Sequence, residues 1–262
     1  MDGCRLLGMN SGVAQAFGFP ESRDPQAVTV GSQVSPETLD QLTGSLNARL
    51  ECELRTADNQ MEPPGAVDYY ATFFVDWFPG DMDTEPDGVV LAAAARAAGI
   101  TDADSECVEI PVGRAHFLIV DTADPNLYEA LDAREGDLEL LGSVLLSQGH
   151  LVDALADQLE IGSGYGILGN SLSIDAPWRG MHLGLRGAAL ALNELRRGCD
   201  FAAVFPMEPG TRKEDERHAS HARLAKYWAR LGFELWQNQI MVLDLNLTTF
   251  DQSVATAGIR LV

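Results

Sequence analysis

The residues with the clearest chemical potential in this 262-residue chain lie between an apolar segment and an Ala/Leu-rich predicted helix. This segment, Arg179–Gly184, has the sequence RGMHLG. The first turn of a helix has unpaired N–H groups and the positive end of the helix dipole, so a phosphate binds there when the side chains are small. Gly180 and Gly184 are small, and Arg179 adds a positive charge. The segment therefore predicts a site for an anionic ligand.

This segment resembles the acyl-CoA-binding motif of the Gcn5-related N-acetyltransferase (GNAT) superfamily. The motif has Arg or Gln, two residues, Gly, one residue, and then Gly or Ala. Arg179 and Gly184 match its first and last positions, whereas His182 stands where the family usually has a glycine. A second segment, His221–Phe233, is similar to the last helix of the family and its Leu-Gly-Phe ending. The resemblance covers about residues 110–247.

The resemblance implies that the chain uses an acyl-CoA, with acetyl-CoA as the expected co-substrate, and that it needs no metal. It also implies that backbone groups of the strand before the motif bind the pantetheine arm. The positions that match the cofactor site of the family are Leu172, Ile174, Arg179, Gly180, Met181, His182, Leu183, Gly184, His221 and Trp228.

Acyl transfer to an amine needs a base for the amine and an acid for the leaving thiolate. The resemblance implies direct transfer without an acyl-enzyme, with a tyrosine as the acid at the position that Trp228 occupies here. Tyr227 is the candidate acid, although neighbouring helix residues point about 100° apart. Asp175 and Glu208 follow predicted strands and are the candidate bases. Three readings stay open: Tyr227 acts as the acid through a local helix distortion, water is the acid, or the protein has lost catalysis.

The predicted function is an N-acyltransferase that acts on a primary amine of a small molecule or peptide. The alternative is a non-catalytic GNAT-fold protein, either a CoA-binding sensor or an interaction module. His182 and Trp228, which depart from the family pattern, favour this alternative. Because the strand after Gly232 often contributes to dimers in relatives, a homodimer is a further expectation.

Charge is divided unevenly along the chain. Residues 161–262 hold 11 of the 18 Lys and Arg residues, whereas the preceding residues carry most of the formal net charge of −21. The basic residues therefore surround the predicted anion site, and the acidic remainder would repel nucleic acid. This acidic surface either attracts an amine substrate or serves only to keep the protein soluble.

The composition predicts a soluble protein of the cytoplasm that does not bind membranes. No apolar run reaches the roughly 20 residues of a membrane helix, and the first residues lack a basic region before an apolar one. The four cysteines are widely spaced, which favours free thiols in a reducing compartment.

The predicted elements alternate between strands and helices, as in an α/β protein. The resemblance implies a mixed, mostly antiparallel twisted sheet flanked by helices in a GNAT-like domain at residues 106–262. Residues 1–105 would form an extension or a degenerate subdomain. The expected helices are Pro36 to about Glu53 with Ser35 as N-cap, Val89–Ala98, Asn126–Leu146 with Gly136 as a possible break, and Leu151–Leu159. The expected strands are Tyr69–Phe78, Ala115–Asp121, Gly166–Ile174 and Phe201–Phe205, followed by a hairpin of Phe233–Trp236 and Ile240–Leu245.

Overall fold

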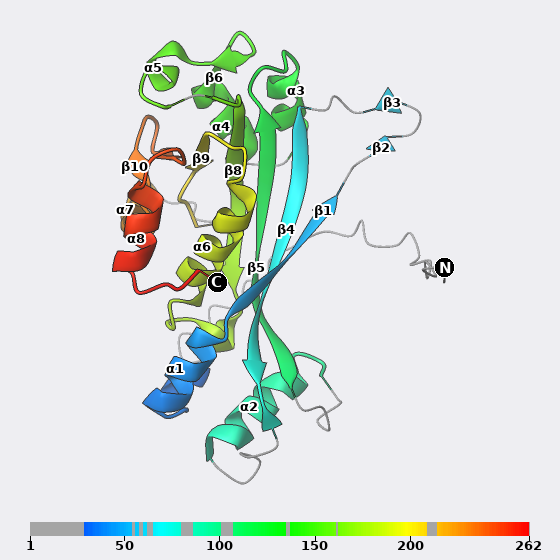
Figure 1. Cartoon of the computed structure of the whole chain (residues 1–262), viewed down its shortest axis with the longest axis vertical. Coiled ribbons are helices and arrows are strands. Elements are labelled where there is room, and N and C mark those ends of the chain that lie inside the picture. The colour runs from blue at the N-terminus through cyan, green and yellow to red at the C-terminus, as the bar shows by residue number, and fades with distance from the viewer. Residues whose placement is uncertain are drawn as a thin grey trace.

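A seven-stranded sheet forms the centre of the molecule (Figure 1). The structure is a computed structural model that describes residues 29–53, 56–57, 60–61, 65–79, 86–100, 107–134, 137–160, 162–208 and 214–261. The strand order is β1-β4-β5-β8-β9-β11-β10, and every neighbouring pair is antiparallel except β8 and β9, which are parallel. The strands are β1 (Asn47–Glu53), β4 (Ala66–Trp77), β5 (Val108–Asp121), β8 (Tyr165–Ile174), β9 (Phe201–Val204), β10 (Glu234–Leu235) and β11 (Met241–Asp244). The predicted mixed, mostly antiparallel sheet is thus confirmed.

Helices cover both faces of this sheet. The α-helices are α1 (Pro36–Gly44), α2 (Pro86–Ala97), α3 (Leu127–Asp132), α4 (Asp137–Leu145), α5 (Asp153–Ala156), α6 (Leu183–Leu195), α7 (Glu214–Ala229) and α8 (Thr249–Thr256). Two short 3-10 helices, η1 (Val30–Ser32) and η3 (Ala176–Trp178), precede α1 and α6. Two small hairpins complete the described elements: β2 (Thr56–Ala57) with β3 (Gln60–Met61), and β6 (Leu146–Ser147) with β7 (His150–Leu151).

Alternating residues of β5 separate two hydrophobic cores. Ala115 and Phe117 pack in the core that contains the buried residues of α6, whereas Leu118 and Val120 pack in the core that contains those of α3 and α4. Side chains of a strand alternate between the faces of the sheet, so these cores lie on opposite faces. We call these faces the α6 side and the α3–α4 side.

The helix predicted from Pro36 to Glu53 is wrong in its second half. The helix begins as predicted, with the Ser35 side chain accepting a hydrogen bond from the Thr38 amide, but it ends at Gly44. Residues 47–53 instead form β1, which pairs with β4 over its whole length. Pairing with a long, half-buried strand outweighs the modest helix propensity of this segment.

The other predicted elements are found with shifted ends. The strand predicted at Tyr69–Phe78 is β4, and the closing hairpin is β10 and β11. The helix predicted over Asn126–Leu146 is divided into α3 and α4, with Gly136 itself outside the described residues. The helix predicted over Leu151–Leu159 is reduced to α5. Strands β1 and β4, from the first 105 residues, belong to the same sheet as the later strands.

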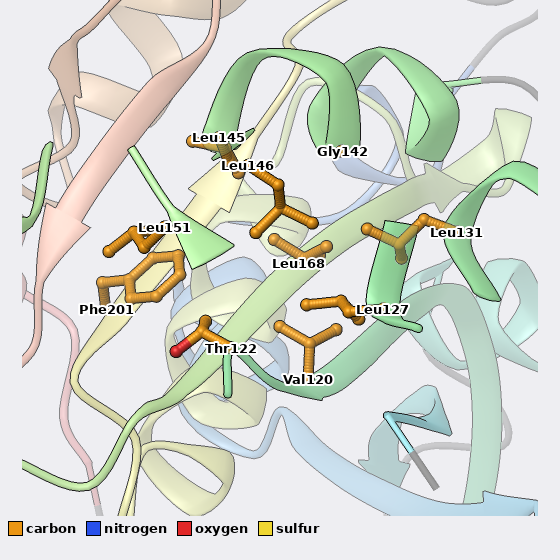
Figure 2. Close-up of a pocket in the computed structure, with 10 residues that line it drawn as sticks. All are labelled: Val120, Thr122, Leu127, Leu131, Gly142, Leu145, Leu146, Leu151, Leu168 and Phe201. Atoms are coloured by element: carbon orange, nitrogen blue, oxygen red, sulfur yellow. The ribbon is translucent and has the colours of Figure 1, made fainter. Parts of the chain in front are cut away.

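The core on the α3–α4 side contains a cavity of about 10 Å³ (Figure 2). Apart from Thr122, its lining is apolar: Val120, Leu127, Leu131, Gly142, Leu145, Leu146, Leu151, Leu168 and Phe201. A cavity of this size holds about one water molecule at most, and an apolar lining gives that water few partners. It is a packing void rather than a ligand site. In the described part of the chain, no helix has the length and apolar character needed to cross a membrane.

Gly187 allows α6 to lie close to the sheet. A Cβ atom at this position would be 2.8 Å from the Phe73 ring, which is fully buried on β4. We therefore expect Gly187→Ala to destabilise the protein by about 1–3 kcal/mol, because the added methyl group overpacks the core. Urea denaturation measures this change.

Gly44→Ala is the matched control, because a Cβ at Gly44 would meet no atom within 4 Å. Alanine there should leave stability unchanged or raise it by up to about 1 kcal/mol. Equal stability of the two variants would contradict close packing at Gly187.

Candidate functional site

Strands β8 and β9 separate after four paired positions. Gly166–Gly169 pair with Phe201–Val204, and β8 then continues to Ile174 without β9 beside it. The bulged residue on β8 is Asn170, which has no partner on β5. Beyond Val204 comes Pro206, which has no N–H group for a ladder, and the Met207 amide donates to the Phe205 carbonyl in a tight turn. A gap between the two strands therefore opens at Asn170.

On the side of the gap, one edge of the β8 backbone has no described strand beside it. The amide of Asp175 donates to the Val112 carbonyl on β5, so the backbone groups of alternate residues point the same way. Those of Leu172 and Ile174 consequently point away from β5 and into the gap. Among the described residues, no strand pairs with this edge. The Ile174 carbonyl is already engaged, because it accepts a 2.9 Å hydrogen bond from Nε of the exposed Arg179.

A tight turn leads from this edge into α6. Gly180 and His182 both have positive φ angles, +86° and +57°. His182 adopts the left-handed conformation that glycine adopts more readily, and its side chain is exposed. The buried side chains of Met181 and Leu183 anchor the turn in the core. The histidine thus occupies a backbone position that glycine would adopt more easily.

Gly184 brings α6, β8 and α7 together. A Cβ at Gly184 would lie 2.6 Å from the Tyr227 hydroxyl oxygen, 3.1 Å from the Leu172 side chain and 3.2 Å from the Ile174 side chain. Tyr227 therefore reaches the first turn of α6 next to the exposed edge of β8. Within the described residues, nothing hydrogen-bonds to its hydroxyl. Burial raises the pKa of Tyr227, so this hydroxyl keeps its proton at neutral pH.

Trp228 and His221 lie elsewhere on α7. The Trp228 ring is buried and packs edge-to-face on Phe233, with ring centroids 5.2 Å apart. His221 Nε2 donates a 2.9 Å hydrogen bond to the Gln239 carbonyl. Both contacts hold α7 against the segment around β10, so of these α7 residues the structure brings only Tyr227 to Gly184.

Of the two candidate bases, Asp175 is exposed at the start of η3. Glu208 lies after β9 and forms an ion pair with Arg223 of α7, and its amide donates to the Ser220 hydroxyl at 3.3 Å. These contacts tie the loop after β9 to α7. No contact joins either carboxylate to Tyr227 in the described structure.

A groove of about 300 Å³ lies between α1 and the start of α6. Its charged and titratable lining residues are His182, Arg186, Arg230 and Asp40. Arg186 donates to the Thr43 carbonyl at 3.1 Å, and Arg230 lies 3.4 Å from His182 Nδ1. We call this the basic groove. Two arginines against one carboxylate make it suitable for an anionic group.

A buried polar network crosses three strands on the α3–α4 side. It consists of Asp68 and Tyr70 on β4, His116 on β5, Asn170 on β8, and Arg134 after α3. Asp68 is only 1% exposed. Sequence reasoning missed this network, although Asp68 and His116 are polar residues inside otherwise apolar strand segments.

The contacts in this network fix the protonation of its members. Burial alone would raise the pKa of Asp68, but the hydrogen bonds from His116 and Arg134 and the positive charge of Arg134 outweigh burial and lower it. His116 Nε2 lies 2.8 Å from Asp68 Oδ1, and His116 Nδ1 lies 2.9 Å from the Asn170 amide nitrogen. Because the ionised Asp68 can only accept, Nε2 carries the proton and donates, and Nδ1 accepts from Asn170.

Comparison with known proteins identifies no family. No family model matches the chain, and no curated protein matches it. One solved structure with detectable similarity is the apo form of a mutant agmatine N-acetyltransferase, at 14% identity and a TM-score of 0.34, covering 63% of this chain and 83% of that one. At this TM-score the function has to be inferred from the site itself.

The left-handed conformation of His182 leads to a test of stability. His182→Gly should stabilise the protein by about 1 kcal/mol, because glycine tolerates a positive φ without the steric cost that a Cβ brings. His182→Ala keeps the Cβ and should bring no such gain. Thermal or urea unfolding of both variants measures the difference, and equal behaviour would contradict strain at this position.

The network of Asp68 should make stability depend on acid pH. Because the pKa of Asp68 is lower in the folded protein than in the unfolded chain, the unfolded chain takes up this proton first as the pH falls. The carboxylate therefore contributes fully above about pH 5 and loses its contribution as the pH falls through the folded pKa. In urea titrations from pH 7 to pH 3, Asp68→Asn should start less stable and vary less below pH 5. Parallel curves for wild type and variant would contradict this role.

Proposed function

We propose that the chain is an acyl-CoA-dependent N-acyltransferase that moves an acetyl group from acetyl-CoA to a primary amine. The observation that carries this proposal is the gap between β8 and β9, which leaves a backbone edge open directly before a helix N-terminus. An extended amide-containing arm can pair with such an edge as an added strand would. The pantetheine arm of CoA has this form, and its phosphates need an anion site at one end.

The phosphates would bind at the start of α6. There the N-terminus of α6 follows the turn Gly180–His182, which also lines the basic groove, and the exposed Arg179 comes directly before this turn. From this end the arm would run along Ile174 and Leu172 toward Asn170, where the strands meet and the gap closes. The acyl group would then lie beside Asn170, in the narrow part of the gap.

Tyr227 is the acid that this arrangement favours. Its hydroxyl lies at the first turn of α6, near the side chains of Leu172 and Ile174, and burial keeps it protonated. It can therefore donate a proton or a hydrogen bond to the sulfur that leaves as the amine attacks. Direct attack requires no nucleophile from the protein.

A non-catalytic CoA-binding protein is the second candidate. It is favoured by the bond from Arg179 to the Ile174 carbonyl, which already occupies one of the backbone groups that the arm would use. In an enzyme, the hydrogen bond between Arg179 and the Ile174 carbonyl would have to break when CoA binds. A sensor could instead use the same exchange as its response to the ligand.

Calorimetry with acetyl-CoA tests the cofactor site. Wild type should bind acetyl-CoA with micromolar affinity. Titrations with desulfo-CoA and with adenosine 3′,5′-bisphosphate separate the contributions of the thioester, the pantetheine arm and the phosphates to this affinity. Arg179→Glu should weaken binding at least about tenfold, or about 1.4 kcal/mol. Arg197→Glu is the control, because Arg197 is highly exposed just beyond the other end of α6. Absence of binding at millimolar acetyl-CoA would contradict both candidate functions.

Thiol release with an amine panel tests the reaction. The panel contains agmatine, butylamine and a lysine peptide. If the chain is an enzyme, Tyr227→Phe should lower kcat by about 10²-fold or more and leave the affinity for acetyl-CoA unchanged. Binding of acetyl-CoA without turnover of any amine would favour the sensor instead.

A further inference from the structure

We infer that His116, supported by Asp68, is the general base that removes a proton from the amine, which enters from the α3–α4 side. This inference rests on the proposed function, and it replaces Asp175 and Glu208 as candidates for the base. It is carried by the position of the buried polar network at the bulge of β8.

The network adjoins the closed end of the gap. The last paired position of β8 and β9 is Gly169 with Val204, and the next residue, Asn170, bonds to His116 Nδ1. His116 is opposite Ser171 in the register of β5 and β8. A β-bulge re-aims side chains, and bulges are frequent beside active sites. The atom of His116 that can accept a proton is therefore aimed at the residue beside which the acyl group would lie.

The contacts of His116 orient its ring and leave one nitrogen able to act as a general base. Nε2 donates to the buried carboxylate of Asp68, which fixes the tautomer and stabilises the ring once it becomes charged. The Tyr70 ring stacks on the imidazole with 4.5 Å between centroids and 5° between planes. In the described network, Nδ1 accepts a hydrogen bond only from the Asn170 amide. An N–H group of the substrate amine can replace that donor. The His116 side chain is 14% exposed, whereas that of Asp68 is 2% exposed, so the ring is the accessible member of the pair.

The acid and the base then lie on opposite faces of the sheet. His116, Leu118 and Val120 alternate with Phe117, so the imidazole is on the α3–α4 side. Tyr227, Leu172 and Ile174 pack in the core of the α6 side. The sulfur and the amine nitrogen would meet in the gap, with one proton-transfer group on each side of it. The amine would therefore approach past β4 and β5 rather than past α6.

Every proton in the proposed reaction has a donor and an acceptor. An ammonium substrate gives one proton to His116 Nδ1, and the freed lone pair forms the C–N bond with the thioester carbon. The C–S bond breaks, the sulfur leaves with its electron pair, and it takes a proton from Tyr227. The second proton lost by nitrogen restores Tyr227 through water, and His116 releases its proton to solvent.

The test is the pH dependence of kcat/KM for His116→Ala with agmatine and butylamine as amine probes. In addition to the rise of kcat/KM with pH that deprotonation of the amine itself produces, wild type should show a limb that depends on His116. The variant should lose about 10²-fold or more in kcat, show no such limb, and recover activity when imidazole is added. His150→Ala, which replaces an exposed histidine on β7, should behave as wild type. Because Asp68 keeps its ion pair with Arg134, we expect His116→Ala to fold, and its thermal midpoint checks this.

The outcomes separate this inference from the proposed function. Calorimetry with acetyl-CoA on the same variant should give an unchanged affinity, because His116 lies beyond the acyl end of the site. Turnover of a probe amine with an unaltered pH profile in His116→Ala would overturn the role of His116 and leave the N-acyltransferase standing. Binding of acetyl-CoA by wild type without turnover of either amine would overturn the base and leave only the cofactor site. Absence of acetyl-CoA binding would overturn the proposed function itself.

Discussion

The unpaired backbone edge of β8 is the constraint on which the rest of the site depends. Peptide N–H and C=O groups away from water need partners, and a strand normally finds them in its neighbours. Here Pro206 ends β9 while β8 runs on through the bulge at Asn170 to Ile174. Part of this demand is met within the chain, because Arg179 binds the Ile174 carbonyl. A ligand with amide groups of its own can satisfy the remainder.

Glycines allow the elements around the gap to pack closely. A Cβ at Gly166 would lie 2.4 Å from the Phe201 ring, and one at Gly169 would lie 2.8 Å from the Val204 side chain, so neighbouring side chains cover both positions. Gly184 has the same role on α6, where the Tyr227 hydroxyl takes the space. Because these positions have no side chain, β9 and α7 can lie close to β8 on either side of the gap. Larger residues would separate the groups that the proposed reaction needs together.

Sequence reasoning predicted the elements around the site better than the site itself. The order of β8, α6, β9 and the closing hairpin follows from apolar runs and turn residues, which are local signals. The helix α7 was expected from the resemblance of His221–Phe233 to the last helix of the GNAT superfamily. The course of Asn47–Glu53 was not predictable in this way, because its strand conformation comes from pairing with β4. The network of Asp68, His116 and Asn170 was missed for the same reason. Its members are far apart in the sequence, and only the strand register brings them together.

Amide hydrogen exchange at Leu172 and Ile174, followed by NMR with and without acetyl-CoA, tests the central claim most directly. If the arm of CoA pairs with the open edge of β8, both amides should exchange at least about tenfold more slowly in the complex. The amide of Leu168, in the part of β8 that is already paired with β9, serves as the internal reference. Unchanged exchange at Leu172 and Ile174 with saturating acetyl-CoA would show that the gap is not the cofactor site.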